Sequence, residues 1–281
     1  MNIAAGVPAI DTMKRLQFKD ELWEIGTSVN RQWDTNMLRI TYESPCAPWT
    51  WYDVDMTKPQ SNAAESAAAL TKVKQKAVLN FNGDLYTTRR AFVAASDGTQ
   101  VPISMVYRKD LFQGEFKDGK APHPVPTMLY GYGSYGICID PGFDAKILPY
   151  LDRGMLYCIA HVRGGGEMGR HWYEKQGKYL NKRNTFSDFI ECAEHLVHNG
   201  YTTPSTLAIE GRSAGGLLVG AVLNMRPDLF QVAVAGVPFV DVMNTMCNDF
   251  DIILALFSLL ASSTSIPTVP HRERARSTAT F

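Results

Sequence analysis

The sequence predicts an α/β fold, in which a mostly parallel sheet is covered by helices on both faces. From residue 127 onward, short apolar segments typical of strands alternate with longer segments that have the helical period. These strand segments are almost wholly apolar, as expected for strands buried on both faces, and they cover residues 127–130, 156–160, 207–209 and 232–235. The third of them runs through a glycine-rich turn directly into a helical pattern. Together, the alternation, the apolar strands and this turn predict a parallel sheet with crossover helices.

The composition is that of an ordinary soluble globular protein. Of the 281 residues, 45% are hydrophobic and 20% are charged, and the 28 basic residues balance the 28 acidic ones. A formal net charge of zero gives no reason to expect a nucleic-acid or anionic-membrane partner. The five cysteines are scattered without a C-x-x-C pair, which favours reduced thiols and a cytoplasmic location. No signal peptide is expected, and the longest apolar run, residues 252–261, is too short to span a bilayer.

The first 69 residues are expected to form β structure followed by a linker. Strand alternation occurs in three segments separated by polar turns, at residues 22–25, 37–42 and 49–56. So few strands leave edges and one face bare, and they are therefore expected to belong to something larger. Residues 57–69 are rich in alanine and polar residues and predict a low-complexity linker.

A hairpin and two helices are predicted between and around the apolar strands. The hairpin strands are expected at residues 91–95 and 101–107, and a charged, Gly/Pro-rich loop is expected at 109–126. Helices are predicted near residues 144–152 and 186–198, and Asn199-Gly200 ends the second of them.

The glycine-rich turn at residues 211–215 fits the pattern G-x-S-x-G between a strand and a helix. This is the context of a nucleophile elbow, in which the serine hydroxyl is lifted above the sheet. Glycines at 211 and 215 suit a strained turn that neighbouring chain approaches closely. The turn would present the Ser213 hydroxyl and aim the Ala214 N–H at a developing oxyanion. The alternative is a tight strand-to-helix turn without chemistry.

A second glycine-rich loop, residues 131–136, fits G-x-G-x-x-G and follows a predicted strand. Dinucleotide binding would require a helix to begin inside the glycines, and Pro141-Gly142 prevents that helix. In a hydrolase, the loop after this strand supplies a second oxyanion donor. The Tyr132 phenol can donate such a hydrogen bond, although an aromatic packing residue would also fit this position.

Two further clusters have simpler explanations. Residues 161–167 form another glycine-rich loop after a predicted strand, and we expect it to support the wall of the site. Glu194, His195 and His198 share one helix, which raises the possibility of a metal site. Their order is not H-E-x-x-H, and such residues usually form a solvated helix face.

A general base for Ser213 is not apparent in the sequence. Hydrolases of this type have the order Ser, acid, His, and the groups that follow the serine are Asp241, Asp249, Asp251 and His271. Only 68 residues follow Ser213, whereas each further βαβ unit takes about 30 residues. His271 lies in a polar, proline-punctuated tail that is expected to be disordered. The histidines at 161, 171, 195 and 198 precede the serine and do not fit the order.

Four motifs resemble the prolyl oligopeptidase family, most closely its oligopeptidase B branch, at residues 129–136, 161–169, 210–216 and 226–230. The resemblance extends from near the N-terminus to about Met246. It implies an α/β-hydrolase domain capped by a β-propeller that admits only short peptides. The implied activity is that of a serine peptidase that cleaves after Arg or Lys through an acyl-enzyme.

When the residue roles of the family are carried over by motif position, the resemblance implies that Ser213 is the nucleophile. It makes the Ala214 N–H and the Tyr132 hydroxyl the oxyanion hole. Asp140 occupies a position where the branch can place an acid near a basic substrate residue, and Gly142 stands where a second acid can occur. The resemblance implies no cofactor or metal, names short peptides as partners, and leaves the oligomeric state open.

The resemblance also divides the chain into three parts. Residues 1–75 would be the last β-propeller strands and a linker, residues 76–247 a hydrolase domain incomplete at its C-terminal end, and residues 248–281 a divergent, disordered or frame-shifted tail. Segments that would carry the triad Asp and His are not recognisable after Cys247. Three hypotheses therefore stay open: an active serine peptidase, an inactive fragment lacking the triad Asp and His, and an esterase that uses His271.

Overall fold

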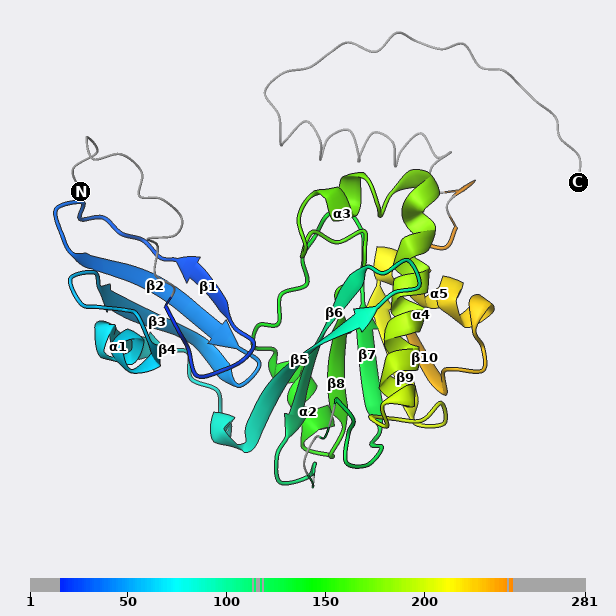
Figure 1. Cartoon of the computed structure of the whole chain (residues 1–281), viewed down its shortest axis with the longest axis horizontal. Coiled ribbons are helices and arrows are strands. Elements are labelled where there is room, and N and C mark those ends of the chain that lie inside the picture. Colours follow the sequence, from blue (N-terminus) through cyan, green and yellow to red (C-terminus); the bar gives the residue numbers. More distant parts are fainter. Residues whose placement is uncertain (1–15, 113, 115–116, 118, 242, 245–281) are drawn as a thin grey trace, which may run out of the picture. The chain divides into compact units, whose positions relative to one another are not determined.

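The computed structural model describes residues 16–112, 114, 117, 119–241 and 243–244 (Figure 1). The chain divides into two units, Met1–Phe239 and Val240–Phe281. The fold described below is that of the first unit. The expectations for Asp249, Asp251, His271 and the tail at 248–281 fall outside the described residues. Within the described residues, no helix has the length and apolar character needed to cross a membrane.

A four-stranded antiparallel sheet with the order β1-β2-β3-β4 forms the N-terminal part of this unit. Its strands are β1 (Glu24–Thr27), β2 (Met37–Ser44), β3 (Ala47–Asp55) and β4 (Leu70–Gln75). The first three correspond to the segments whose alternation predicts strands. The strands follow one another in space as they do in sequence, which is the arrangement of a simple meander.

The linker prediction for residues 57–69 is wrong in its second half, because helix α1 (Ala63–Ala69) forms there. Asn62 caps this helix by accepting a hydrogen bond from the Glu65 backbone N–H at 3.0 Å. The Glu65 carboxylate in turn accepts from the Ser61 N–H at 2.7 Å. A capped run of alanines, the best helix formers, explains why a segment of simple composition is ordered here.

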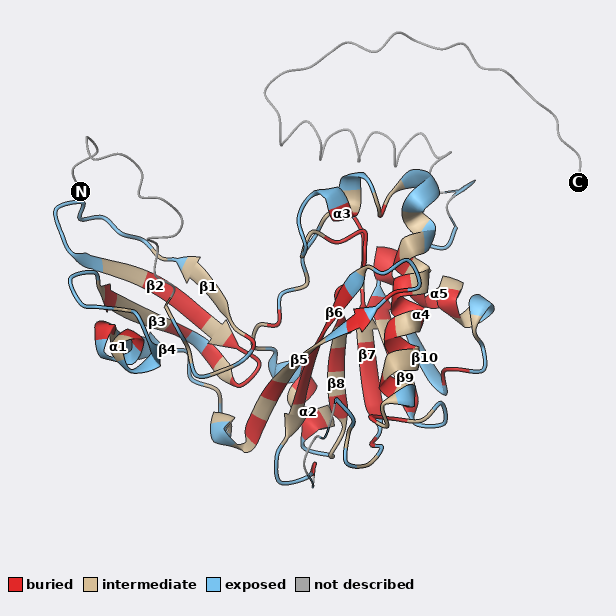
Figure 2. Ribbon diagram, viewed as in Figure 1, coloured by how far each residue is buried: buried red, intermediate tan, exposed pale blue. Residues whose placement is uncertain are grey.

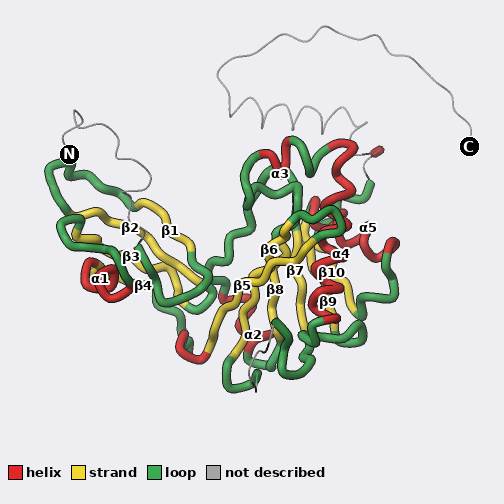
Figure 3. The backbone as a smooth tube through the Cα atoms, viewed as in Figure 1, coloured by secondary structure: helices red, strands yellow, loops and turns green. Residues whose placement is uncertain are grey.

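A six-stranded mixed sheet forms the rest of the unit, in the order β10-β9-β7-β8-β6-β5 (Figure 3). Its strands are β5 (Tyr86–Ala94), β6 (Gln100–Arg108), β7 (Thr127–Gly131), β8 (Leu156–Ala160), β9 (Leu207–Arg212) and β10 (Val232–Gly236). The four strands β10, β9, β7 and β8 run parallel, whereas β6 and β5 are an antiparallel hairpin at one edge. Parallel neighbours end at the same edge of the sheet, so the loops after β7, β8 and β9 meet there.

Helices accompany the sheet as the α/β prediction requires. The helical elements are η2 (Gly83–Leu85), η3 (Ala145–Ile147), α2 (Leu148–Leu151), α3 (His171–Glu174), η4 (Tyr179–Lys182), α4 (Arg183–His198) and α5 (Ala214–Met225). Helices α4 and α5 contact each other, α4 contacts β5 and β6, and α5 contacts β7, β9 and β10. The short α2 contacts β6 and β8. The α/β class is therefore confirmed.

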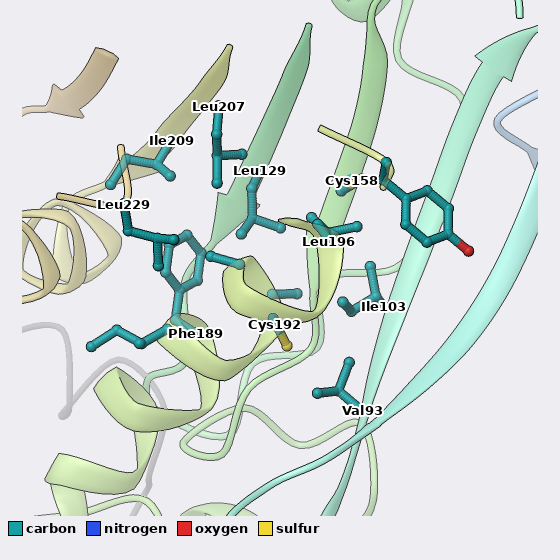
Figure 4. Packing of buried hydrophobic residues seen from close by; sticks show 14 of the residues in the cluster. Val93, Ile103, Leu129, Cys158, Phe189, Cys192, Leu196, Leu207, Ile209 and Leu229 are labelled. Carbon is teal, nitrogen blue, oxygen red and sulfur yellow. The ribbon is translucent and has the colours of Figure 1, made fainter. Parts of the chain in front are cut away.

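The main core lies between the six-stranded sheet and the helices α4 and α5 (Figure 4). Phe189 and Leu196 of α4 are fully buried and face strand residues such as Leu129 and Ile209. Figure 2 shows the central strands as the most buried part of the unit. A second, smaller cluster joins α2 to the sheet and includes Cys46, Tyr86, Val106, Ile147 and Leu151. Strand β10 differs from the other parallel strands, because four of its five residues are exposed.

Candidate active site

Ser213 lies between the end of β9 and the start of α5, at the carboxyl edge of the sheet. Its backbone has φ 54° and ψ −116°, a conformation that a non-glycine residue adopts only under strain. The Ser213 N–H donates to the Gly236 carbonyl at 2.9 Å, and the Ser213 carbonyl accepts from the Phe239 N–H at 3.1 Å. These bonds hold the strained turn. The Ser213 residue is exposed, whereas Ala214 beside it is buried.

The glycines at 211 and 215 are required by close approach of the neighbouring backbone. A Cβ added at Gly211 would lie 2.2 Å from the Gly215 carbonyl oxygen. A Cβ added at Gly215 would lie 2.6 Å from the Gly131 carbonyl oxygen and 3.4 Å from the Tyr132 Cα. The turn at Ser213 is thus packed directly against the loop after β7.

The loop after β7 brings Tyr132 next to this turn. Tyr132 is half-buried, and burial, together with the neighbouring Tyr135, raises the pKa of its phenol above the ordinary value. A phenol is protonated at neutral pH even at its ordinary pKa, so the Tyr132 hydroxyl can donate a hydrogen bond. The loop turns through positive φ angles at Gly133, Tyr135 and Gly136. Two of the three sites are glycines, which adopt such angles without steric cost.

The loop after β8 is held by an ion pair inside the core. The Arg163 guanidinium bonds to the Asp188 carboxylate of α4, which is fully buried, and the Arg163 backbone N–H donates to the same carboxylate at 2.9 Å. The guanidinium also pairs with Asp97 of the β5–β6 turn. The Thr185 hydroxyl of α4 donates to the Arg163 carbonyl at 2.6 Å. This loop is therefore held against α4, and Arg163 is committed to that contact. Its support of the wall of the site stays a prediction.

The histidine that directly follows β8 is committed to other partners. His161 is buried, and its Nε2 lies 2.6 Å from the Ser104 hydroxyl oxygen. Its Nδ1 faces the Glu167 carboxylate at 3.5 Å, and that carboxylate accepts from the Ile139 N–H at 3.0 Å. Among the described residues, no histidine or carboxylate is hydrogen-bonded to the Ser213 hydroxyl. The structure thus brings Ser213, Ala214 and Tyr132 together and gives the serine no base within the described part.

The helix that suggested a metal site has other contacts. Glu194 pairs with Arg226, and the His195 ring is 3.1 Å from the Asn199 amide. Across the residues that the structure describes, no three His, Cys, Asp or Glu side chains are grouped so that they could hold a metal ion. Asp241, a potential triad acid by chain order, bonds to Asn244.

Asp140 lines a cavity of about 430 Å³. The cavity is also lined by Glu210 and Arg212 of β9, by Tyr130 of β7 and by Ser104 of β6. Asp140 itself is exposed, and Glu210 faces the same space from the strand that leads to Ser213. The cavity is thus bordered by the Asp140 and Glu210 carboxylates and by Arg212, the residue that directly precedes Ser213.

Sequence reasoning missed two carboxylates of the N-terminal sheet. A Cβ added at Gly142 would lie 2.7 Å from the Glu43 carboxylate oxygen, so Glu43 occupies the space that a side chain at 142 would need. Burial, then the charges of Asp140 and Glu43, raise the pKa of the Glu24 carboxyl above its ordinary value. No local pattern could have indicated these residues, because the contact joins segments about a hundred positions apart.

Comparison with known proteins gives a consistent set of relatives. The sequence profile described as "Prolyl oligopeptidase family" matches residues 141–256. Dipeptidyl aminopeptidase BI of Pseudoxanthomonas mexicana is 41% identical over 228 residues, which are 81% of this chain and 29% of that protein. Protease 2 of Moraxella lacunata is 39% identical over 234 residues, 83% of this chain and 31% of that protein.

Solved structures give the same result. Oligopeptidase B from Trypanosoma brucei with covalently bound antipain superposes with a TM-score of 0.68 and 54% identity, over 83% of this chain and 31% of that chain. Oligopeptidase B from Leishmania major superposes with a TM-score of 0.69 and 49% identity, over 83% of this chain and 30% of that chain. The chain thus spans less than a third of the length of these relatives.

Proposed function

The chain belongs to the prolyl oligopeptidase family, and from this premise we propose that it carries the nucleophile and the oxyanion hole of a serine peptidase that cleaves short peptides after Arg or Lys. The observation that carries the proposal is the strained backbone of Ser213, packed through Gly215 against Tyr132. A chain retains this strain where a reactive side chain must be presented in a fixed direction. We assign residues 76–247 to a partial α/β-hydrolase domain.

In this mechanism the Ser213 hydroxyl oxygen attacks the scissile carbonyl carbon while a base takes its proton. The carbonyl oxygen becomes an oxyanion that accepts hydrogen bonds from the Ala214 N–H and the Tyr132 hydroxyl. Return of the proton to the leaving amine breaks the C–N bond and leaves an acyl-enzyme. Water then attacks the acyl carbon and releases the serine. The base is assigned to no described residue, because none of them is bonded to the Ser213 hydroxyl.

The preference for basic residues is supported by the carboxylates around the site. Burial raises the pKa of Glu24, and the charges of the nearby Asp140 and Glu43 raise it further. A cationic substrate side chain placed among them would relieve this repulsion, whereas a carboxylate would increase it. The resemblance to the oligopeptidase B branch implies the same preference for Arg or Lys.

The four-stranded sheet β1–β4 is assigned to the end of a β-propeller. A blade of a propeller is a four-stranded antiparallel sheet, and the strand order of β1–β4 agrees with that pattern. Residues 1–75 would then be the last propeller strands and the connection to the hydrolase domain. Short peptides are the proposed partners, since a propeller over the site would exclude folded proteins.

A labelling experiment tests the proposed function. The purified chain is treated with a fluorophosphonate probe, which reacts with an activated serine, and its turnover of short fluorogenic peptides ending in Arg, Lys or Pro is measured. We expect labelling that is lost in Ser213→Ala and weakened roughly 100-fold in Tyr132→Phe, because one oxyanion donor is removed. Cleavage after Arg and Lys should exceed cleavage after Pro. Labelling that persists in Ser213→Ala would contradict the proposal.

The second candidate function is that of an inactive member of the family that lacks the triad Asp and His. The observation that favours it is the absence of a histidine bonded to Ser213 among the described residues. Such a protein retains only the catalysis that an oxyanion hole provides without a base. It would be folded by circular dichroism and yet give no labelling at Ser213. Robust labelling would exclude it.

A further inference from the structure

A lysine of the segment before α4 reaches into the loop that carries Tyr132. Lys182 is the last residue of η4, and its ammonium donates hydrogen bonds to the Gly133 carbonyl and to the Ser134 hydroxyl, the second at 2.8 Å. These two acceptors directly follow Tyr132. Ser134 is buried, and Lys182 is partly buried. A flexible surface lysine would instead extend into solvent.

The Lys182 ammonium has no negatively charged partner among the described residues. The ammonium lies over the ring of Phe186, whose centroid is 5.9 Å from Nζ. Among the residues that the structure describes, no carboxylate forms an ion pair with Lys182. Its charge is therefore balanced by two neutral oxygens of the Tyr132 loop. Desolvating an ammonium group without a carboxylate partner is costly, and the two hydrogen bonds offset part of that cost.

The loop also leaves little room for another arrangement. Gly133 has φ +66°, and an added Cβ there would lie 2.4 Å from the Thr185 methyl group and 2.6 Å from a Val162 methyl group. The Gly136 N–H donates to the Gly164 carbonyl at 3.0 Å, and the Ile137 N–H donates to the Ser134 carbonyl at 3.1 Å. The loop is thus packed against α4 and against the segment after β8, and Lys182 bonds to the Gly133–Ser134 peptide.

We propose that Lys182 is a positioning residue for the oxyanion hole, because its two hydrogen bonds fix the Gly133–Ser134 peptide and thereby the direction of the neighbouring Tyr132 hydroxyl. The catalytic consequence rests on the proposed function, whereas the structural role does not. An oxyanion donor must lie within about 0.5 Å of its productive position. A displacement of about 1 Å can reduce a rate roughly 100-fold.

Because Lys182 can lose its proton, its effect on the loop should depend on pH, whereas the effect of a side chain that does not titrate should not. Burial lowers the pKa of Lys182 to about 8. The titratable and charged groups on the packed segments are Tyr132 and Tyr135 of the loop, Arg163 and Glu167 after β8, Lys178 of the preceding turn, and Arg183 and Asp188 of α4. Below about pH 8 the ammonium forms charge-assisted bonds, which are roughly twice as strong as bonds from the neutral amine.

Hydrogen exchange of the full chain tests the proposal. In Lys182→Met, the Gly136 and Ile137 amides should exchange roughly tenfold faster, because about one charge-assisted bond is lost. The Gln231 amide, which donates to the Leu207 carbonyl, reports whether the sheet is intact. Lys175→Met is the matched control, because it removes the same charge from an exposed position seven residues earlier. Ser134→Ala, which removes one of the two acceptors, should give a smaller effect.

The pH dependence completes the test. In the wild type, the protection factors of the Gly136 and Ile137 amides should fall as the pH rises through about 8. In Lys182→Met they should not depend on pH over this range. Equal protection of these amides in the wild type and Lys182→Met would overturn the proposal, as would the same loss at Gln231.

The fluorophosphonate reaction separates this proposal from the proposed function. If the wild type is labelled at Ser213, Lys182→Met should lower the maximal labelling rate more than the probe affinity. An unchanged maximal rate would overturn the catalytic part of the inference. If the wild type is not labelled, the proposed function fails, and the exchange of the Gly136 and Ile137 amides still decides whether Lys182 positions the loop.

Discussion

At the scale of single residues, the site depends on the absence of side chains as much as on their presence. Ser213 can be strained only because Gly211 and Gly215 let three stretches of backbone approach within contact distance. The Gly131 carbonyl lies at the centre of this contact, since it faces both glycines. A methyl group at either position would have to move backbone and not merely a flexible side chain.

Gly211→Ala is therefore expected to destabilise the protein by about 3 kcal/mol, at the upper end of the range for overpacking. The added Cβ would lie 2.2 Å from a carbonyl oxygen. The free energy of unfolding would be measured by urea denaturation, with Gly98→Ala as the control. Gly98 has φ +83° and open space around it, so this control carries only the backbone cost of about 1 kcal/mol. Equal losses in the two variants would contradict the steric explanation.

The carboxylate of Asp97 links stability to acid pH. Burial raises the pKa of Asp97, but hydrogen bonds from Arg163 and from Thr99 outweigh burial and lower the pKa to about 2. A carboxyl whose pKa is lower in the folded state stabilises the fold above its unfolded value of about 3.9 and loses this contribution as the pH falls towards 2. Asp97→Asn should therefore weaken the dependence of the unfolding free energy on pH between about 4 and 2. Urea denaturation at several pH values would show it, and an unchanged slope would contradict it.

At the scale of elements, α4 organises the site more than any strand does. Its first two turns hold the loop after β8 through Thr185 and Asp188, and its buried face packs on the sheet through Phe189. A Cβ at Gly131 would lie 2.6 Å from the Phe189 ring, so this helix also sets the end of β7. One helix thus couples the core to two loops of the site.

Phe189→Ala is expected to cost roughly 3–5 kcal/mol of unfolding free energy, because the ring is fully buried and its removal leaves a cavity. Phe92→Ala on β5 is the control, since that ring is mostly exposed and its loss should cost less than about 1 kcal/mol. Chemical denaturation of both variants would measure the difference. A loss at Phe189 no larger than the loss at Phe92 would show that α4 is not a main support.

Much of this element order could be predicted from the sequence. Apolar strands, the hairpin and the turn at Ser213 are local patterns, and helix α4 begins only three residues before its predicted start. Helix α1 was missed because alanine-rich composition resembles a linker until the cap at Asn62 is considered. The contacts of Glu43 and His161 join distant segments, and no local pattern contains them. The assignment of Ser213, Ala214, Tyr132 and Asp140 to catalysis and binding stays a prediction.

At the scale of the whole unit, strand β10 forms one edge of the six-stranded sheet. Strand β10 pairs only with β9 among the described strands, and Val232 and Val234 are 52% and 44% exposed. Its sequence is that of a strand buried on both faces. An apolar edge strand presents free N–H and carbonyl groups to other chains, which favours self-association.

Val234→Lys is expected to reduce concentration-dependent self-association, because a charge on an edge strand opposes edge-to-edge pairing. Light scattering of the purified chain over a range of concentrations would measure it. Leu180→Lys is the control, since Leu180 is 96% exposed and lies outside any strand. If both variants reduce scattering equally, general surface hydrophobicity and not the β10 edge drives the association.

The Glu43 carboxylate beside Gly142 has a consequence for exchanging parts between related proteins. Because this charge comes from β2, the acidity around Asp140 belongs jointly to the N-terminal sheet and to the loop after β7. A chimera that keeps residues 76–247 and takes its N-terminal sheet from elsewhere would receive whatever side chain that sheet carries at the equivalent of 43. The charge around Asp140 would then be altered by recombination alone, with every residue of the loop unchanged.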